Sequence, residues 1–123
     1  MPYAVIVDDN LESSETLAIL LEMEGYDAAT AASLGEARRR LAEHRPDVLI
    51  LDRALPDGQG MDFIEEALRD GPMTVVLLTG LSDAADAAEA VRRGAAAYLV
   101  KPTTIDQLKA VLDQAASRTT SQV

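Results

Sequence analysis

The strongest constraint on this chain is a set of short apolar runs, each followed at once by a polar or charged residue. Four such runs are rich in Val, Leu and Ile and are too short for helices: residues 3–7, 48–51, 75–78 and 98–100. Helical patterns separate them, so we expect parallel strands buried on both faces of one sheet. Open sheets of this kind bind ligands at the carboxyl ends of their strands. The residues that follow the runs are therefore expected to meet at one edge: Asp8, Asp9, Asp52, Thr79, Lys101 and Pro102.

Length and composition limit the class of protein. The 123 residues suffice for one domain with its own core. The absence of cysteine excludes disulfides and thiolate metal sites. No apolar segment approaches the roughly 20 residues that span a bilayer, and the N-terminus lacks the features of a signal peptide, so we expect no membrane association and a cytoplasmic location. A net charge of −10 disfavours direct binding of nucleic acid by this domain.

Turn residues and helix-capping patterns divide the chain into five strand–helix units. The first helical pattern ends at Gly25, and its candidate buried positions are Leu11, Leu17, Leu20, Leu21 and Met23. Residues 27–32 form a weak strand candidate, suited to a sheet edge. Capping-box spacings at Ser33 and Thr104 open two later helices. The remaining elements are expected as strands over residues 47–51, 74–78 and 96–100 and as helices over residues 61–68 and 83–93.

The units predict a single α/β domain over residues 1–118. Right-handed crossovers and five strands favour a doubly wound parallel sheet of strand order 2-1-3-4-5. Strands one and three are then neighbours, which places Asp8, Asp9 and Asp52 side by side, with Thr79 and Lys101 on the same rim. The polar segment from residue 117 onward is expected to fray, with residues 119–123 as a flexible tail or the start of a linker.

Three carboxylates in a small space repel one another, and a hard divalent cation such as Mg²⁺ explains their joint presence. With the metal bound, the Lys101 ammonium and the Thr79 hydroxyl would complete a site for a phosphoryl group. No His, Cys or Ser lies among these residues to compete as nucleophile, which leaves a carboxylate to form an acyl phosphate. Asp52 is the best placed, between the acidic pair on one side and Thr79 and Lys101 on the other.

These residues closely resemble the receiver domain of two-component response regulators, from Val5 to about Ala115. The resemblance implies a flavodoxin-like (βα)5 fold and a Mg²⁺ cofactor. It implies that Asp9 ligates the metal directly and Asp8 through water, with the backbone carbonyl of Ala54 completing the protein ligands. It also implies that Asp52 accepts a phosphoryl group from the phosphohistidine of a partner.

The same resemblance implies a response to phosphorylation. Thr79, Tyr98 and Lys101 with Pro102 correspond to the responding residues, and the bond before Pro102 is a candidate cis peptide. The surface formed by the helix over residues 83–93, the strand that follows it and the last helix would change. The implied partners are a sensor histidine kinase or phosphotransfer protein, an output domain or downstream protein, and a second copy in a phosphorylation-dependent homodimer.

Three positions depart from the common receiver pattern or inform its kinetics. Arg53 stands where the family usually has an apolar residue, and its guanidinium could pair with Asp57 or another acid, or bias the site electrostatically. Ala54 offers no side chain to orient an attacking water, and Leu81 would hinder its approach. We therefore expect slow self-dephosphorylation.

Each candidate residue also has a purely structural interpretation. Asp8, Asp9 and Asn10 could cap the first helix, Asp52 could be a loop acid, and Thr79 or Ser82 could cap the helix after residue 82. Taken alone, Lys101 would be a surface lysine, Tyr98 a half-buried strand aromatic and the bond before Pro102 trans.

Three other functions compete with the receiver interpretation. A haloacid dehalogenase-like phosphohydrolase would need Asp-x-Asp at the nucleophile, where this chain reads Asp52-Arg53-Ala54. A dinucleotide-binding domain would need Gly-x-Gly-x-x-Gly after the first strand. A receiver-like interaction domain that acts without phosphorylation is disfavoured because all the expected chemical groups are present, although Arg53 keeps it open.

Overall fold

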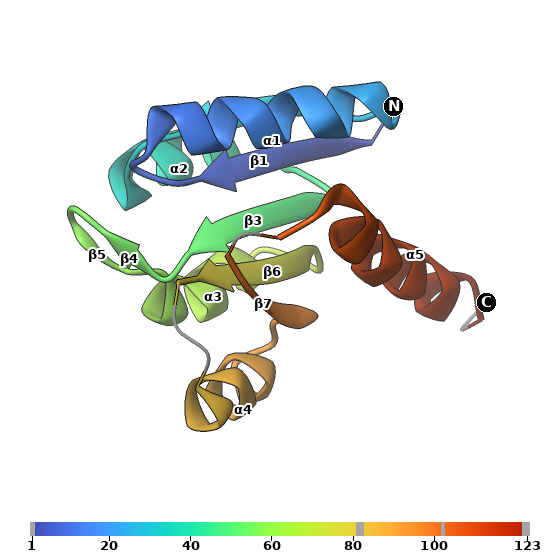
Figure 1. Cartoon of the computed structure of the whole chain (residues 1–123). Coiled ribbons are helices and arrows are strands. Elements are labelled where there is room, and N and C mark those ends of the chain that lie inside the picture. Colours follow the sequence, from blue (N-terminus) through green and yellow to red (C-terminus); the bar gives the residue numbers. More distant parts are fainter. Residues whose placement is uncertain (1, 81–82, 102, 122–123) are drawn as a thin grey trace.

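The computed structural model describes residues 2–80, 83–101 and 103–121, with side chains of the last helix described as far as residue 114. Within these ranges, five parallel strands form one sheet in the order β2 (Asp27–Ala31), β1 (Tyr3–Val7), β3 (Val48–Asp52), β6 (Thr74–Thr79) and β7 (Ala97–Val100). This is the predicted doubly wound order, and the alanine-rich strand β2 lies at an edge as expected. Figure 1 labels the other four strands of the sheet, β1, β3, β6 and β7.

Helices cover both faces of the sheet (Figure 1). On one face lie α1 (Leu11–Met23) and α5 (Ile105–Ser121). On the other lie α2 (Leu34–Glu43), α3 (Gly60–Leu68) and α4 (Ala84–Arg92). None of the helices in the described part of the chain is long and apolar enough to cross a membrane.

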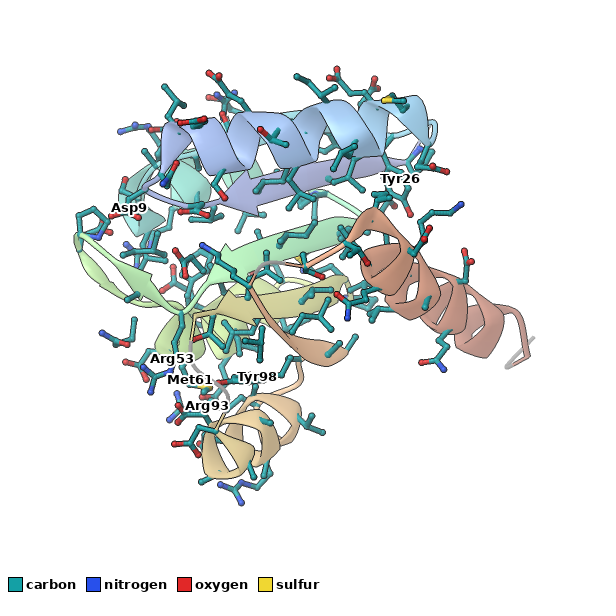
Figure 2. The ribbon with its side chains drawn as sticks, in the orientation of Figure 1. Asp9, Tyr26, Arg53, Met61, Arg93 and Tyr98 are labelled. Atoms are coloured by element: carbon teal, nitrogen blue, oxygen red, sulfur yellow. The ribbon has the colours of Figure 1, made fainter. Side chains whose placement is uncertain are left out.

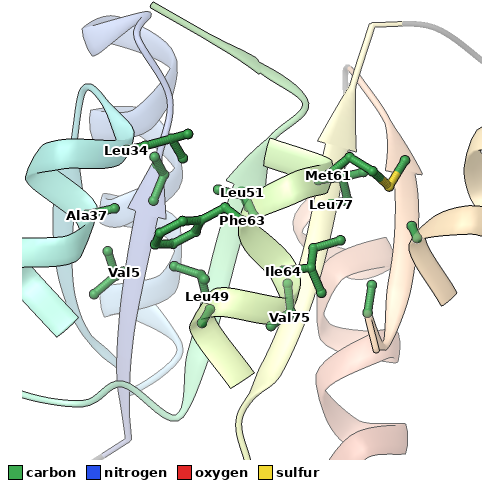
Figure 3. Packing of buried hydrophobic residues seen from close by; sticks show 14 of the residues in the cluster. Val5, Leu34, Ala37, Leu49, Leu51, Met61, Phe63, Ile64, Val75 and Leu77 are labelled. Atoms are coloured by element: carbon green, nitrogen blue, oxygen red, sulfur yellow. The ribbon is translucent and has the colours of Figure 1, made fainter. Parts of the chain in front are cut away.

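The central strands carry continuous apolar runs because both of their faces are covered. Successive side chains of a strand point to opposite faces. Leu49 and Leu51 of β3 accordingly join the core beneath α2 and α3, whereas Ile50 joins the core beneath α1 and α5. Figure 3 shows the Phe63 ring of α3 lying against the buried strands. The two core layers fix the orientation of the strands, and hence of the residues that follow them.

The predicted capping boxes begin the helices as expected. Ser33 Oγ accepts a hydrogen bond of 3.1 Å from the amide of Glu36 at the start of α2. Thr104 Oγ1 accepts from the amide of Gln107, and Gln107 Oε1 accepts from the amide of Thr104, both at 3.1 Å. Helix α5 continues to Ser121, beyond the point at which fraying was expected. The domain boundary near residue 118 stays a prediction.

Two burial predictions for α1 are wrong. Leu11 is 59% exposed and Met23 is 76% exposed. The buried stripe of α1 consists of Ser14, Leu17 and Leu21, which are spaced by three and four residues on one side of the helix. Leu11 and Met23 lie off this stripe. They are the first and last residues of α1, and both side chains are exposed to solvent.

A short hairpin follows β3, where the sequence indicated only a turn. Its strands β4 (Ala54–Leu55) and β5 (Gly58–Gln59) pair antiparallel. Gly60 then begins α3 in close contact with β3, since an added Cβ would lie 2.0 Å from the carbonyl oxygen of Asp52. Its amide also donates to the carbonyl of Arg53 at 2.7 Å. The backbone of Asp52 and Arg53 is therefore packed directly against the first turn of α3.

Replacing Gly60 by Ala is expected to destabilise the protein by about 2 kcal/mol, because the new methyl group must displace the backbone of Asp52. Urea unfolding measures the change. Gly35→Ala is the matched control, since a Cβ there meets its nearest atom at an ordinary 3.5 Å and should be neutral or slightly stabilising in a helix. Equal stabilities for the two variants would contradict the close packing at Gly60.

Candidate functional site

Three carboxylates meet at the carboxyl edge of the sheet. Val7 lies beside Leu51 in the β1–β3 register, so Asp8 and Asp52 follow their strands at the same level. Asp8, Asp9 and Asp52 each offer an oxygen within 4.8 Å of the others. Asp8 is buried, Asp52 is half-buried and Asp9 is exposed. The parallel register thus assembles the acidic cluster that the sequence predicted.

Lys101 supplies the positive charge at this edge. Its Nζ donates to Asp8 Oδ2 at 2.8 Å and to Asp52 Oδ2 at 3.3 Å. Its backbone amide donates to the carbonyl of Thr79 at 2.6 Å, which fixes the start of the segment after β7. Burial opposes protonation of Lys101, but the hydrogen bond to Asp8 and the charges of both carboxylates raise its pKa above the usual value. Lys101 therefore stays a cation, shared between two acids.

The ammonium does not fully balance the charge on Asp52. Burial raises the pKa of Asp52, the Lys101 charge lowers it, and the neighbouring Asp8 raises it again, with a net upward shift. A raised pKa means that the folded site disfavours the ionised carboxylate. Further positive charge is thus favoured at this edge.

The oxygen donors of the cluster fit a hard divalent cation. Carboxylate oxygens are ligands that both Mg²⁺ and Ca²⁺ take in proteins. Asp9 faces solvent, which leaves room for the waters that Mg²⁺ keeps. Ala54 lies exposed in β4, directly after Asp52 and Arg53 in the chain.

Asn10 performs the helix-capping role that the sequence left open among three residues. Its side chain accepts a hydrogen bond of 3.0 Å from the amide of Ser13 and caps α1. Asp8 instead accepts from the amide of Asn10 at 2.9 Å and turns its other oxygen to Lys101. The helix cap therefore leaves Asp8 directed into the acidic cluster.

The other predicted site residues lie around the same edge. Thr79 is buried at the end of β6, and Asp52 is the last residue of β3 rather than a loop acid. Tyr98 is half-buried on β7 and packs against the core layer beneath α3 and α4.

The cap of α4 is Asp83, which accepts hydrogen bonds from the amides of Ala85 and Asp86. The predictions for Leu81, Ser82 and Pro102 lie outside the described residues.

Arg53 pairs with an acid of α4 and not with Asp57. Its Nη2 lies 2.8 Å from Asp86 Oδ2, and both side chains are largely buried. Asp57 caps α2 instead, accepting from the amides of Leu34 at 2.8 Å and Gly35 at 2.9 Å. These two hydrogen bonds lower the pKa of Asp57. The sequence had not identified Asp57 as a helix cap, because the helix it caps begins 23 residues earlier.

A cavity of about 560 Å³ opens beside the cluster, between α1 and the segment after β7. Asp8 and Lys101 belong to its lining, together with Ser13, Thr16 and Thr103. Of the three clustered carboxylates, only Asp8 lines this cavity.

Comparison with known proteins identifies the family. Residues 4–113 match the model of the response regulator receiver domain. The chain belongs to this family. This receiver is 35% identical over 121 residues to the transcriptional regulatory protein KdpE of Mycobacterium tuberculosis, a match that covers 98% of this chain and 54% of KdpE. The receiver thus spans about half the length of this relative.

Solved structures share the fold. A response regulator from Burkholderia pseudomallei, determined with a phosphorylated aspartic acid, calcium ion and citrate, superimposes with a TM-score of 0.88 and 28% identity over 99% of this receiver and 72% of that chain. The beryllofluoride-activated NtrC4 receiver domain dimer superimposes with a TM-score of 0.87 and 32% identity over 94% of this receiver and 96% of that chain. The flavodoxin-like receiver fold predicted from the sequence is confirmed.

Replacing Asp52 by Asn is expected to stabilise the receiver in EDTA, because the folded site disfavours the Asp52 charge. At a hundredfold excess over its dissociation constant, Mg²⁺ should stabilise the wild type by about 2.7 kcal/mol and the variant less. Thermal unfolding in EDTA and in rising Mg²⁺ measures both effects.

The matched control is Asp70→Asn, which removes the same charge from an exposed position before β6, at the opposite edge of the sheet. It should show neither effect. A wild type indifferent to Mg²⁺, or an Asp52→Asn variant less stable than the wild type in EDTA, would contradict this account of the cluster.

Proposed function

We propose that this receiver accepts a phosphoryl group on Asp52 in a Mg²⁺-dependent reaction. The observation that carries the proposal is the position of Asp52, which is half-buried beside the other two acids and hydrogen-bonded to Lys101. The phosphorylated aspartic acid and calcium ion of the Burkholderia pseudomallei protein support it. So does the beryllofluoride activation of the NtrC4 receiver. The proposed donor is the phosphohistidine of a sensor histidine kinase or phosphotransfer protein.

In the proposed reaction an oxygen of Asp52 attacks phosphorus, and the bond from phosphorus to the donor nitrogen breaks. The product is an acyl phosphate on Asp52, and the donor imidazole leaves with the electron pair of the broken bond. Bound by Asp8, Asp9, Asp52 and the carbonyl of Ala54, Mg²⁺ would offset the negative charge of the cluster and of the incoming group. Lys101 then holds its ammonium beside the acceptor oxygen, so the domain assists its own phosphorylation.

The phosphoryl group changes the charge at the carboxyl edge. It adds close to two negative charges and three acceptor oxygens. Thr79, at the end of β6, would donate its hydroxyl to one of these oxygens, and Tyr98 on the adjacent strand would turn inward. The surface of α4, β7 and α5 would change as a result. An output domain, a downstream protein or a second copy of the receiver would recognise that surface.

Incubation with Mg²⁺ and acetyl phosphate tests the proposal. We expect the intact mass to rise by one phosphoryl group that hydroxylamine removes, because hydroxylamine cleaves acyl phosphates. The adduct should be absent in EDTA and absent from Asp52→Asn. Asp70→Asn is the control and should be modified like the wild type. If neither acetyl phosphate nor beryllofluoride reacts with the wild type, the receiver acts as an interaction domain without phosphorylation.

Slow loss of the phosphoryl group is a second expectation. Ala54 is exposed two residues after Asp52 and has no polar group to position a water. Ala54→Asn is expected to speed dephosphorylation by about tenfold, which is less than the roughly hundredfold or more that a positioned general acid or base contributes, because an amide can only orient the water. The decay of the adduct mass measures the rate. The control is Ala54→Leu, which adds bulk without polarity and should not speed the loss; identical decay in wild type and Ala54→Asn would contradict the expectation.

A further inference from the structure

Helix α4 has weak apolar anchoring. Five of its nine residues are alanine, and of the residues described in α4 only Ala90 is buried. Val91, its one large apolar side chain, is 59% exposed. A helix with so little buried area gains little from packing. Its position therefore depends more than usual on polar contacts with neighbouring elements.

One such contact lies near the start of α4. The Arg53–Asp86 ion pair joins the first residue after β3 to the first turn of the helix, at 2.8 Å. The side chains are 30% and 24% exposed, and the Nε of Arg53 is buried without a hydrogen-bond acceptor in the described structure. The guanidinium has thus lost hydration and is compensated mainly through Asp86.

The backbone of Arg53 is held firmly. Its amide donates to the carbonyl of Leu78 at 3.0 Å, and its carbonyl accepts from the amide of Gly60 at 2.7 Å. Arg53 also directly follows Asp52, the proposed phosphoacceptor. The ion pair therefore connects α4 to the backbone next to Asp52.

A second contact lies at the other end of α4. Arg93 donates to Asp62 of α3 at 2.8 Å and to Glu89 of α4 at 2.7 Å. Figure 2 shows Arg53 and Arg93 on the side of the molecule that carries α3 and α4. Arg93 also donates to the backbone carbonyl of Met61 at 3.4 Å. Asp62 is 70% exposed, so the Arg93–Asp62 ion pair is more hydrated than the Arg53–Asp86 ion pair.

We propose that the Arg53–Asp86 ion pair restrains α4 in its resting position, breaks when the receiver is activated, and thereby sets the cost of activation. The activation step rests on the proposed phosphorylation of Asp52. A contact that is made in the resting state and broken in the active state lowers the affinity of any group that favours the active state. Removing the pair therefore makes activation easier, although neither Arg53 nor Asp86 is proposed to contact the phosphoryl group.

A direct electrostatic effect of Arg53 on the acidic cluster makes a different prediction. If Arg53 acted only through its charge, removing it would weaken the binding of an anion beside Asp52. Removing the negative charge of Asp86 would have the opposite effect and strengthen that binding. In the restraint proposed here, both substitutions strengthen anion binding, and the double substitution adds nothing further.

Beryllofluoride binding at saturating Mg²⁺ separates the two models. We expect Arg53→Gln and Asp86→Ala each to bind beryllofluoride up to about fivefold more tightly than the wild type, the size expected for one partly exposed ion pair. The double variant should match the single variants. Arg38→Gln removes an ion pair to Glu66 that does not involve α4, and this control should bind like the wild type.

Hydrogen exchange of α4 amides without beryllofluoride provides an independent measurement. Arg53→Gln and Asp86→Ala should both speed exchange in residues 84–92, and Arg38→Gln should not. Two results would overturn the proposed restraint. In the first, the two single variants change beryllofluoride affinity in opposite directions. In the second, they change neither the affinity nor the exchange of α4. If the wild type fails to bind beryllofluoride, the proposed function fails, and the exchange of α4 still decides whether the pair restrains the helix.

Discussion

The site depends on an imbalance of charge at the carboxyl edge of the sheet. Asp8, Asp9 and Asp52 lie within reach of one another, and Lys101 is shared between two of them. Burial of Asp52 makes its negative charge costly, as its raised pKa indicates. Folding therefore builds a place where added positive charge is favoured and a carboxylate oxygen of Asp52 lies beside an ammonium group. In the proposed function, the divalent cation supplies the added positive charge and Asp52 accepts the phosphoryl group.

The rest of the fold keeps that edge in place. Two apolar layers hold the strands in register, so residues distant in sequence end at the same level. Asn10 caps α1 and leaves Asp8 directed to Lys101. Gly60 lets α3 begin against the carbonyl of Asp52. Rigid support of this kind contrasts with α4, which is thinly packed and held by ion pairs. The molecule thus combines a closely packed acidic site with a neighbouring helix that buries little apolar area.

The sequence predicted the sheet order, the five main helices and the residues of the acidic cluster, because apolar runs and the residues after them are local signals. It failed where the outcome depended on contacts between distant segments. Leu11 and Met23 were expected to be buried, but the stripe that contacts the sheet runs through Leu17 and Leu21. Asp86 as the partner of Arg53, and the close approach of Gly60 to Asp52, required the positions of α4 and α3. The glycine at position 60, the second glycine of Gly58-Gln59-Gly60, was the sign of that close approach in the sequence.

The central claim is that Asp52, and neither of its acidic neighbours, becomes the acyl phosphate. Borohydride reduces an aspartyl phosphate to homoserine, which marks the modified residue permanently. The most direct test is to treat the protein with Mg²⁺ and acetyl phosphate, reduce it, digest it and sequence the peptides by tandem mass spectrometry. The account predicts homoserine at position 52 in the Mg²⁺ sample and none in EDTA. Homoserine at position 8 or 9, or at position 52 without any divalent cation, would contradict it.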